Sequence, residues 1–294
     1  MIGIFFNLSV LCHSGAAPYD KPGAAFAFSV VWRNGISTTV WVAQCMVCDG
    51  HEKILTSWLL RSQVDSCVEK WKSTLIGKDT FTRHEQREGP RKKNDTHVPV
   101  RPEGSQLRLT RSTGQRKPCN LKGPWYNEVG SEVIFADKDS LGTFTGEYRT
   151  AVEREKGSAG TSHSLVYGNS GLGDNPNSTF AMMVVWREGA SVTGWVGQCH
   201  ICGENQTEIV EATWLLKTRV QKCGDNWKST MFHDNSFTRH EQKAGPRKHL
   251  DTHTPNRDGE DESGTGEGFI HTPRLDIVCA TLVLTKMFAT LCES

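Results

Sequence analysis

The most constraining feature of this sequence is an internal repeat. The segment Val31–Cys45 (VWRNGISTTVWVAQC) matches Val185–Cys199 (VWREGASVTGWVGQC), 154 positions later. Further matches lie 156 positions apart, among them Phe81-Thr-Arg-His-Glu-Gln with Phe237-Thr-Arg-His-Glu-Gln. Self-similarity on this scale means that one structural unit was copied, so both copies should build from the same elements.

The two copies are unequal in extent. Residues 119–179 precede the matched segment of the second copy and hold several further strand signals, whereas about 25 residues precede the first. We therefore expect a partial copy at 25–86 and a complete domain at 119–242. The residues between them, 87–118, are polar and rich in Arg, Lys, Pro and Gly, which indicates a linker. A polar and then apolar tail follows at 243–294.

The second copy is predicted to be all-β. Period-2 patterning bounded by Gly, Asn and Asp recurs through it, and no 3.6-residue stripe competes. The turns Asp137–Gly142 and Cys202–Gln206 suit hairpins, with Gly142 and Gly203 supplying positive φ. An eight-stranded antiparallel up-and-down barrel, preceded by a four-strand partial copy, fits this pattern. The expected strands are 120–126, 129–136, 142–150, 163–168, 179–187, 191–200, 209–218 and 228–239.

Side-chain parity predicts what such a barrel would hold. Alternate residues along a strand face one side, so an interior is read from every second position. On several expected strands, polar and aromatic residues occupy the same alternating positions and would face one interior. An interior lined in this way fits a ligand site better than a packed apolar core. The sets are Asn127, Val129 and Ser131; Tyr148 and Thr150; Ser191, Thr193 and Trp195; Trp214 and Leu216.

Composition indicates the compartment. Ten cysteines suggest an oxidising environment, and the sequons at Asn94, Asn177 and Asn205 agree with a secreted glycoprotein. Residues 2–12, followed by Ser14-Gly-Ala, resemble a signal peptide, here assigned to 1–17, although no basic residues precede the apolar run and Asn7 interrupts it. The apolar run 277–291 is too short to span a bilayer, so no membrane association is expected.

Two function classes are disfavoured. Lys and Arg total 34 against 33 Asp and Glu, so no broad cationic field exists for nucleic acid. The nucleophile-elbow, zincin and phosphate-loop motifs are missing from any supporting context, so no enzyme and no cofactor are predicted.

From Cys119 to Arg239 the sequence resembles the avidin and streptavidin family of biotin-binding proteins. The resemblance is carried by Cys119-Asn-Leu-Lys-Gly-Pro-Trp-Tyr-Asn-Glu-Val-Gly-Ser131, by Gly142-Thr-Phe-Thr-Gly-Glu-Tyr-Arg-Thr-Ala-Val152, and by the tryptophan motifs beginning at Trp214 and Trp227. It covers about 120 residues here and roughly 26–84 in the first copy. It implies high-affinity, non-catalytic binding of biotin, a bicyclic urea, in the mouth of the barrel.

The resemblance also implies residue roles. Three side chains would donate to the ureido oxygen, two would accept from the ureido nitrogens, and others would meet the sulfur, the carboxylate and the hydrocarbon. The donors are Asn127, Ser131 and Tyr148; the acceptors are Thr150 and Asn235; Thr193 meets the sulfur, Ser191 the carboxylate, and Trp186, Trp195 and Trp214, with Val129 and Leu216, line the pocket. Trp227 would close the pocket of a neighbouring subunit, which implies a homo-oligomer, typically a tetramer.

Two regions depart from the family pattern. Glu153–Lys156 and Glu188 replace residues near the carboxylate end, which leaves the affinity open. The first copy keeps Trp32, Trp41, Trp58, Trp71, Ser37, Thr39 and Asp79 but has no upstream donors, so alone it should not bind biotin.

The cysteines allow several pairings. The resemblance implies a Cys119–Cys199 disulfide, and the recurrence of Cys202 and Cys223 as Cys48 and Cys67 suggests a second bridge within each copy. Cys45 could pair with Cys12 or between molecules, and Cys279 with Cys292. The two C-x-x-C pairs could indicate zinc or thioredoxin-like chemistry, but neither has the required context, and no metal site is predicted. The alternative to biotin capture is an extracellular matrix or interaction protein of the fibropellin type.

Overall fold

The protein consists of a closed barrel and an open sheet. The computed structural model describes residues 10–17, 23–67, 69, 74–84, 86, 119–153, 158–159, 163–172 and 177–244. The expected linker 87–118 lies outside these residues, as does all of the expected tail beyond residue 244. The short 3-10 turns in the described part include no helix long and apolar enough to cross a bilayer.

The second copy forms the closed antiparallel barrel, in the order β10-β11-β12-β13-β6-β7-β8-β9. Its eight strands follow the predicted ones in number and order, with ends shifted by a few residues. Gly142 and Gly203 have φ of +80° and +70°, the positive values expected at these turns. The strands are β6 (Gly123–Asn127), β7 (Glu132–Phe135), β8 (Thr143–Arg149), β9 (Ser164–Ser170), β10 (Thr179–Trp186), β11 (Ser191–Cys202), β12 (Thr207–Thr218) and β13 (Thr230–Thr238).

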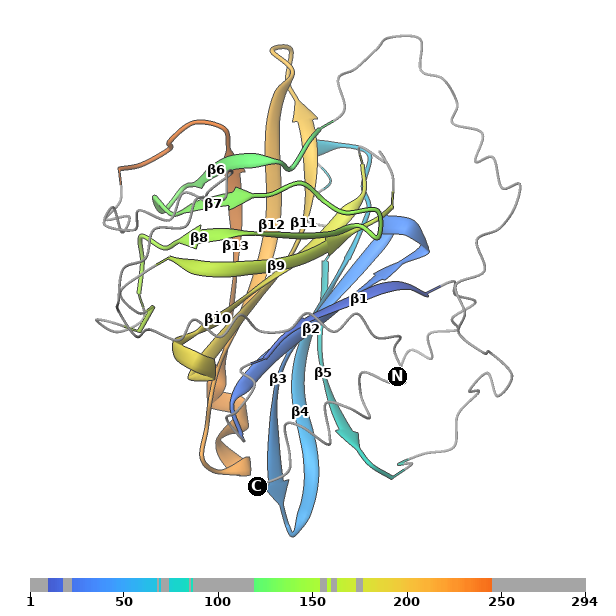
Figure 1. Cartoon of the computed structure of the whole chain (residues 1–294), viewed down its shortest axis with the longest axis vertical. Coiled ribbons are helices and arrows are strands. Elements are labelled where there is room, and N and C mark those ends of the chain that lie inside the picture. Colours follow the sequence, from blue (N-terminus) through green and yellow to red (C-terminus); the bar gives the residue numbers. More distant parts are fainter. Residues whose placement is uncertain are drawn as a thin grey trace, which may run out of the picture.

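The first copy forms a sheet of five strands, in the order β1-β2-β3-β4-β5. Four of these, β2 (Ala25–Trp32), β3 (Ser37–Cys48), β4 (His51–Ser62) and β5 (Thr74–Thr82), are the repeat counterparts of β10 to β13. The fifth, β1 (Val10–Ala16), pairs antiparallel with β2 and lies in the segment that resembles a signal peptide. The open sheet lies against one side of the barrel (Figure 1).

Parity separates the inside of the barrel from its outside. Cross-strand partners such as Trp195 with Trp214, and Val133 with Tyr148, face the same side of the sheet, and all four belong to the cluster that fills the barrel. The alternate residues of β10 to β12 face outward, where Met183, Val192 and Leu215 are fully buried. Their cover is the open sheet, which contributes Ala25, Ala27, Val40, Val42 and Leu59 to the same apolar cluster.

The barrel closes along a short seam between its first and last strands. Strands β13 and β6 pair only at Phe237 with Asn127 and at Thr238 with Tyr126. Arg239 strengthens this seam, since its guanidinium lies 3.8 Å over the Trp125 ring and its Nε donates to Glu208 at 2.9 Å.

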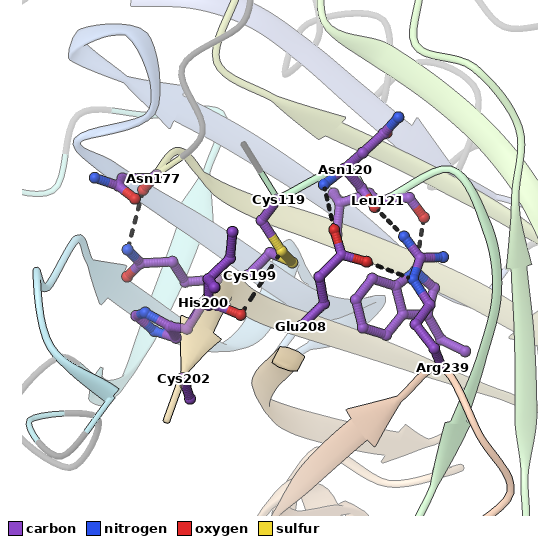
Figure 2. Close-up of a disulfide and its surroundings, with 12 residues drawn as sticks. Cys119, Asn120, Leu121, Asn177, Cys199, His200, Cys202, Glu208 and Arg239 are labelled. Atoms are coloured by element: carbon purple, nitrogen blue, oxygen red, sulfur yellow. Dashed lines mark hydrogen bonds and ion pairs between the residues drawn. A yellow bond between two sulfur atoms is a disulfide. The ribbon is translucent and has the colours of Figure 1, made fainter. Parts of the chain in front are cut away.

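A disulfide anchors the start of the barrel segment beside this seam. Cys119, just before β6, is bonded to Cys199 on β11. Figure 2 shows this bond beside Glu208, which also accepts from the backbone N–H of Asn120 at 3.4 Å. Arg239 completes the anchor by donating to the backbone oxygen of Asn120.

Two further disulfides join the halves and correct the pairing suggested by repetition. Cys48 is bonded to Cys223, and Cys67 to Cys202. No bridge therefore forms within one copy between Cys202 and Cys223. Because Cys48 and Cys202 are repeat equivalents, as are Cys67 and Cys223, each bridge is the counterpart of the other. Cys45 is also disulfide-bonded.

Hydrogen bonds follow the same reciprocal rule. Gln44 donates to the backbone oxygen of Val220 at 2.8 Å and accepts from its N–H at 2.9 Å. Its repeat equivalent Gln198 makes the same pair of bonds with Val64, at 2.8 and 3.0 Å. An interface in which residue i meets j and the equivalent of j meets the equivalent of i has two-fold symmetry. The two copies are therefore related by a pseudo-two-fold axis.

Candidate binding site

The candidate site lies inside the barrel, beside the seam where the first strand, β6, pairs with the last strand, β13. Asn127 ends β6 and Ser131 follows the next turn, while Asn235 lies on β13 across the seam. Tyr148 on β8 and Trp195 on β11 complete the set, with ring centroids 5.2 Å apart. Residues far apart in sequence thus face one interior, as parity predicted.

Three side chains present hydrogen-bond donors to this interior. The Oδ1 atom of Asn127 accepts from the Ser131 backbone N–H at 2.7 Å, and its buried Nδ2 has no hydrogen-bond partner within the described part of the chain. The Ser131 hydroxyl accepts from the Ala151 N–H at 3.0 Å, and its own proton can be donated to the Tyr148 hydroxyl oxygen or to a ligand. The Tyr148 hydroxyl is the third donor.

Tyr148 is held in its neutral form. Burial raises the pKa of its hydroxyl to about 12, although a hydrogen bond with Ser131 opposes that rise. The phenol therefore carries its proton throughout the physiological range. A protonated phenol at this position can donate, which a phenolate could not.

Two oxygens present acceptors. The Thr150 hydroxyl donates to the Val152 backbone oxygen at 2.6 Å and accepts from the Val152 N–H at 3.2 Å, so one lone pair of its oxygen remains for a ligand N–H. The Asn235 amide donates through Nδ2 to Glu128 at 2.7 Å, and its Oδ1 accepts from Trp195 Nε1 at 3.4 Å, which leaves one lone pair of Oδ1 for a ligand N–H. The backbone and Glu128 thus fix the polarity of both groups.

Indole and phenol rings line the rest of the site. Trp186 donates to the Thr193 hydroxyl at 2.8 Å, which fixes this ring and leaves the hydroxyl proton of Thr193 free to donate. The ring of Tyr148 meets that of Trp186 edge to face at 6.0 Å. Trp214 faces the same interior as Trp195, directly opposite it on the neighbouring strand. These rings would surround a flat apolar ligand on several sides.

The remaining predicted residues lie toward the ends of the site. Val129 is in the turn after β6, and Ser191 and Leu216 are half-buried near one end of β11 and β12. Trp227 is in the 3-10 helix η4 (Cys223–Ser229), and its side chain lies outside the described part of the structure, as do residues 154–156. Glu153, directly before residues 154–156, accepts from the Ala159 N–H at 3.4 Å.

Sequence reasoning missed two residues of this site. Glu128 has the parity of the outer face, yet as a turn residue it reaches Asn235 and also accepts from the Ser236 N–H at 2.9 Å. His233 shares the parity of Asn235, and its ring stacks on Trp214 at 6.3 Å. The alternation of side chains along the strand could have predicted His233. The role of Glu128 could not be predicted in this way, because it depends on the pairing of β6 with β13.

The first copy retains one wall of this arrangement. Trp32 donates to Thr39 at 2.7 Å, matching Trp186 and Thr193, and Trp41 donates to Asp79 at 3.2 Å, matching Trp195 and Asn235. The counterparts of β6 to β8, which carry the donors in the barrel, are not among the described strands of the open sheet. This wall therefore lacks the ureido end.

The described residues contain no cluster of three or more potential metal ligands. All four cysteines of the two C-x-x-C pairs are disulfide-bonded, which removes them as zinc ligands and as a CxxC redox pair.

Comparisons with known proteins point to one family. The model of the avidin family matches residues 11–84 and 115–240. Over 124 residues the chain is 35% identical to avidin of Gallus gallus, covering 42% of this chain and 80% of avidin. Over 130 residues it is 38% identical to Fibropellin-1 of Strongylocentrotus purpuratus, covering 44% of this chain but only 12% of that protein.

Solved structures give similar sequence identities. A biotin-binding protein from chicken is 35% identical, with 42% of this chain and 98% of the other covered and a TM-score of 0.39. The corresponding values for Xenavidin are 35%, 42%, 100% and 0.38. Because the family model matches more than half of the sequence, in two segments that correspond to the open sheet and the barrel, the chain belongs to the avidin family.

Proposed function

We propose that the barrel binds biotin without chemical conversion. The observation that carries the proposal is the match of hydrogen-bond polarity. A cyclic urea offers one carbonyl oxygen and two N–H groups, and the site offers three donors and two acceptors. Asn127, Ser131 and Tyr148 would meet the oxygen, while Thr150 and Asn235 would meet the two nitrogens.

Preorganisation supports tight binding. The Ser131, Thr150 and Asn235 groups are each oriented by a further hydrogen bond, so little rotamer freedom remains to be lost when a ligand arrives. Polar groups buried without a ligand must be satisfied by water, and a ligand of matched polarity replaces that water. Thr193 would contact the ring sulfur, and the tryptophans would enclose the bicycle.

The experiment is a titration of the barrel tryptophan fluorescence with biotin. We expect a saturable change that ends at one biotin per chain, since the first copy lacks the ureido donors. Biotin amide, whose tail is uncharged, serves as the matched ligand. With Glu153 and Glu188 at the tail end, we expect it to bind at least as tightly as biotin. No saturable change at micromolar biotin would contradict the proposal.

The alternative is an extracellular structural protein with a weakened site. The 38% identity to Fibropellin-1 favours it. The disulfides joining the halves fit an oxidising compartment, and we propose secretion under either function. This alternative would be favoured if the chain shows no saturable change in the biotin titration but still binds other proteins.

A further inference from the structure

A cleft of about 310 Å³ lies between the two copies, lined by β4 and β5 of the open sheet and by β12 and β13 of the barrel. Its volume is at the lower end of the range for small-molecule sites, roughly 300–1,000 Å³. The exposed side chains of Ile76, Phe232 and Asp234 lie at its entrance, and the buried Leu59 and Arg61 lie at its floor.

The cleft is on the outer side of the barrel wall. Phe232 pairs with Leu215, which packs against the open sheet, so both side chains face away from the barrel interior. Asp234 is two residues further along β13 and faces the same way, whereas the next residue, Asn235, faces the candidate biotin site. The cleft and the biotin site therefore lie on opposite sides of β13.

The floor of the cleft holds a guanidinium with an unused pair of donors. Arg61 is 2% exposed, and its Nη1 donates to the Thr74 hydroxyl at 3.5 Å. Its Nε and Nη2 atoms have no hydrogen-bond partner among the described residues. These two N–H groups lie along one edge of the guanidinium, where they can bind both oxygens of a carboxylate. Because a buried charged donor left unsatisfied is costly, the floor favours a ligand with two acceptor oxygens.

Two carboxylates lie near this guanidinium. Glu211 and Asp234 line the same cleft, and Asp234 accepts from the Thr213 hydroxyl at 2.6 Å, which orients its carboxylate. Burial lowers the pKa of Arg61 to about 10, and the negative charges of Glu211 and Asp234 oppose that fall. A simple anion would be repelled by the two carboxylates, and a simple cation would leave the Arg61 donors unsatisfied. The cleft therefore favours a molecule that carries both charges.

The repeat-equivalent positions do not reproduce this arrangement. Lys217 corresponds to Arg61, and its Nζ donates to two side chains of this chain, at 2.5 and 3.0 Å. The positions of the two carboxylates are held by Leu55 and Lys78. The packing of one copy on the other therefore does not require the charged groups of the cleft.

We propose that this cleft binds a free α-amino acid with an apolar side chain, its carboxylate on Arg61 and its ammonium group on Glu211 and Asp234. The ligand carboxylate accepts from Nε and Nη2, and the ammonium group supplies three N–H donors to the two protein carboxylates. An α-amino acid carries its two charges close together, as the cleft does. Its hydrocarbon contacts Ile76 and Phe232, which are 52% and 63% exposed without a ligand.

The test is equilibrium dialysis of the full oxidised chain against radiolabelled L-leucine. We expect one leucine per chain, with a dissociation constant below about 1 mM. Two competitors each lack one charged group: 4-methylpentanoate has no ammonium group and leucinol has no carboxylate. Each should bind at least about tenfold more weakly than leucine. Saturating biotin should leave the leucine affinity unchanged, because the two sites are on opposite sides of β13, so this result is independent of the proposed function.

Two variants test the charged contacts. Arg61→Lys keeps the charge but removes the paired donors, so leucine should bind at least about tenfold more weakly. Asp234→Asn should weaken leucine binding by a similar factor and leave 4-methylpentanoate binding unchanged or tighter, because one repelling charge is removed. The control is Asp49→Asn, which makes the same change at the exposed turn between β3 and β4 and should alter neither affinity.

The absence of saturable leucine binding up to about 5 mM would overturn the proposal. So would equal affinities for leucine and its two analogues, a comparison that uses only the wild-type chain and does not depend on the folding of a variant. Leucine binding that is unchanged in both Arg61→Lys and Asp234→Asn would overturn it as well. Circular dichroism checks that these two variants are folded.

Discussion

Glu128 accepts a hydrogen bond from Asn235 Nδ2 at 2.7 Å across the closure seam of the barrel, and this contact decides which way the Asn235 amide faces. With Nδ2 occupied, Oδ1, which accepts from Trp195 Nε1 at 3.4 Å, keeps one lone pair for a ligand N–H. The contact therefore joins the closure of the fold to the polarity of the site.

Replacing Glu128 should weaken biotin binding although the residue itself is exposed. In Glu128→Ala the Asn235 amide can turn its N–H toward the ligand N–H, so we expect a loss of about tenfold to a hundredfold in affinity, or about 1–3 kcal/mol. Glu128→Gln, which can still accept, should restore most of it. Competition calorimetry measures both, and equal losses in the two variants would argue against an orienting role.

Tyr148→Phe removes one donor and little volume. We expect the affinity for biotin to fall by about tenfold to a hundredfold, because the remaining donors cannot replace a buried hydrogen bond to the ureido oxygen. Since burial raises the pKa of Tyr148 to about 12, wild-type affinity should not fall through ionisation of this residue between pH 7 and 10. Titrations at several pH values check both statements, and Tyr126→Phe, on β6, is the control.

His200 should make the protein sensitive to mild acid. Burial, aided by the positive charge of Arg61, lowers its pKa to about 4, whereas an unfolded histidine titrates near 6.5. Between these values the unfolded chain binds a proton that the folded chain does not, so stability is present near pH 7 and is lost as the pH falls toward 4.

The matching substitution is present in the sequence, since Met46 is the repeat equivalent of His200. We expect His200→Met to remove about 2 kcal/mol of the stability difference between pH 7 and pH 4.5, as measured by guanidinium unfolding. His233→Gln, at an exposed position, should leave that difference unchanged. An unaltered acid response in His200→Met would show that other groups are responsible.

The disulfides that join the copies predict a definite peptide map. Digestion without reduction should yield linked peptides containing Cys48 with Cys223 and Cys67 with Cys202. A linked Cys202–Cys223 peptide would contradict the reciprocal arrangement. Replacing Cys67 and Cys202 together by serine should lower the unfolding free energy by about 2–4 kcal/mol, because the unfolded chain gains freedom.

Much of the barrel could be predicted from sequence because its signals are local. Period-2 alternation gave eight strands in order, and parity placed Tyr148, Trp195 and Trp214 on one interior. These inferences need only neighbouring residues and the geometry of a strand.

The features that could not be predicted from the sequence are contacts between residues that lie far apart along the chain. Repetition shows that Cys48 and Cys202 are equivalent, but it does not say whether equivalents pair within or between copies. The Glu128 contact likewise exists only because β6 and β13 meet at a seam. Strand β1 was missed because Val10–Ala16 lies in an apolar segment that resembles a signal peptide, and its pairing with β2 uses backbone atoms.

Covalent connection also changes how the two halves respond to dilution. Partners held by non-covalent contacts separate once their concentration falls below the dissociation constant, whereas tethered partners keep a fixed effective concentration. The two halves already share one chain, and with Cys48 joined to Cys223 and Cys67 to Cys202 the open sheet stays on the barrel even when the non-covalent contacts between them open. Substitutions that would have parted two separate subunits can therefore be tolerated within this single chain.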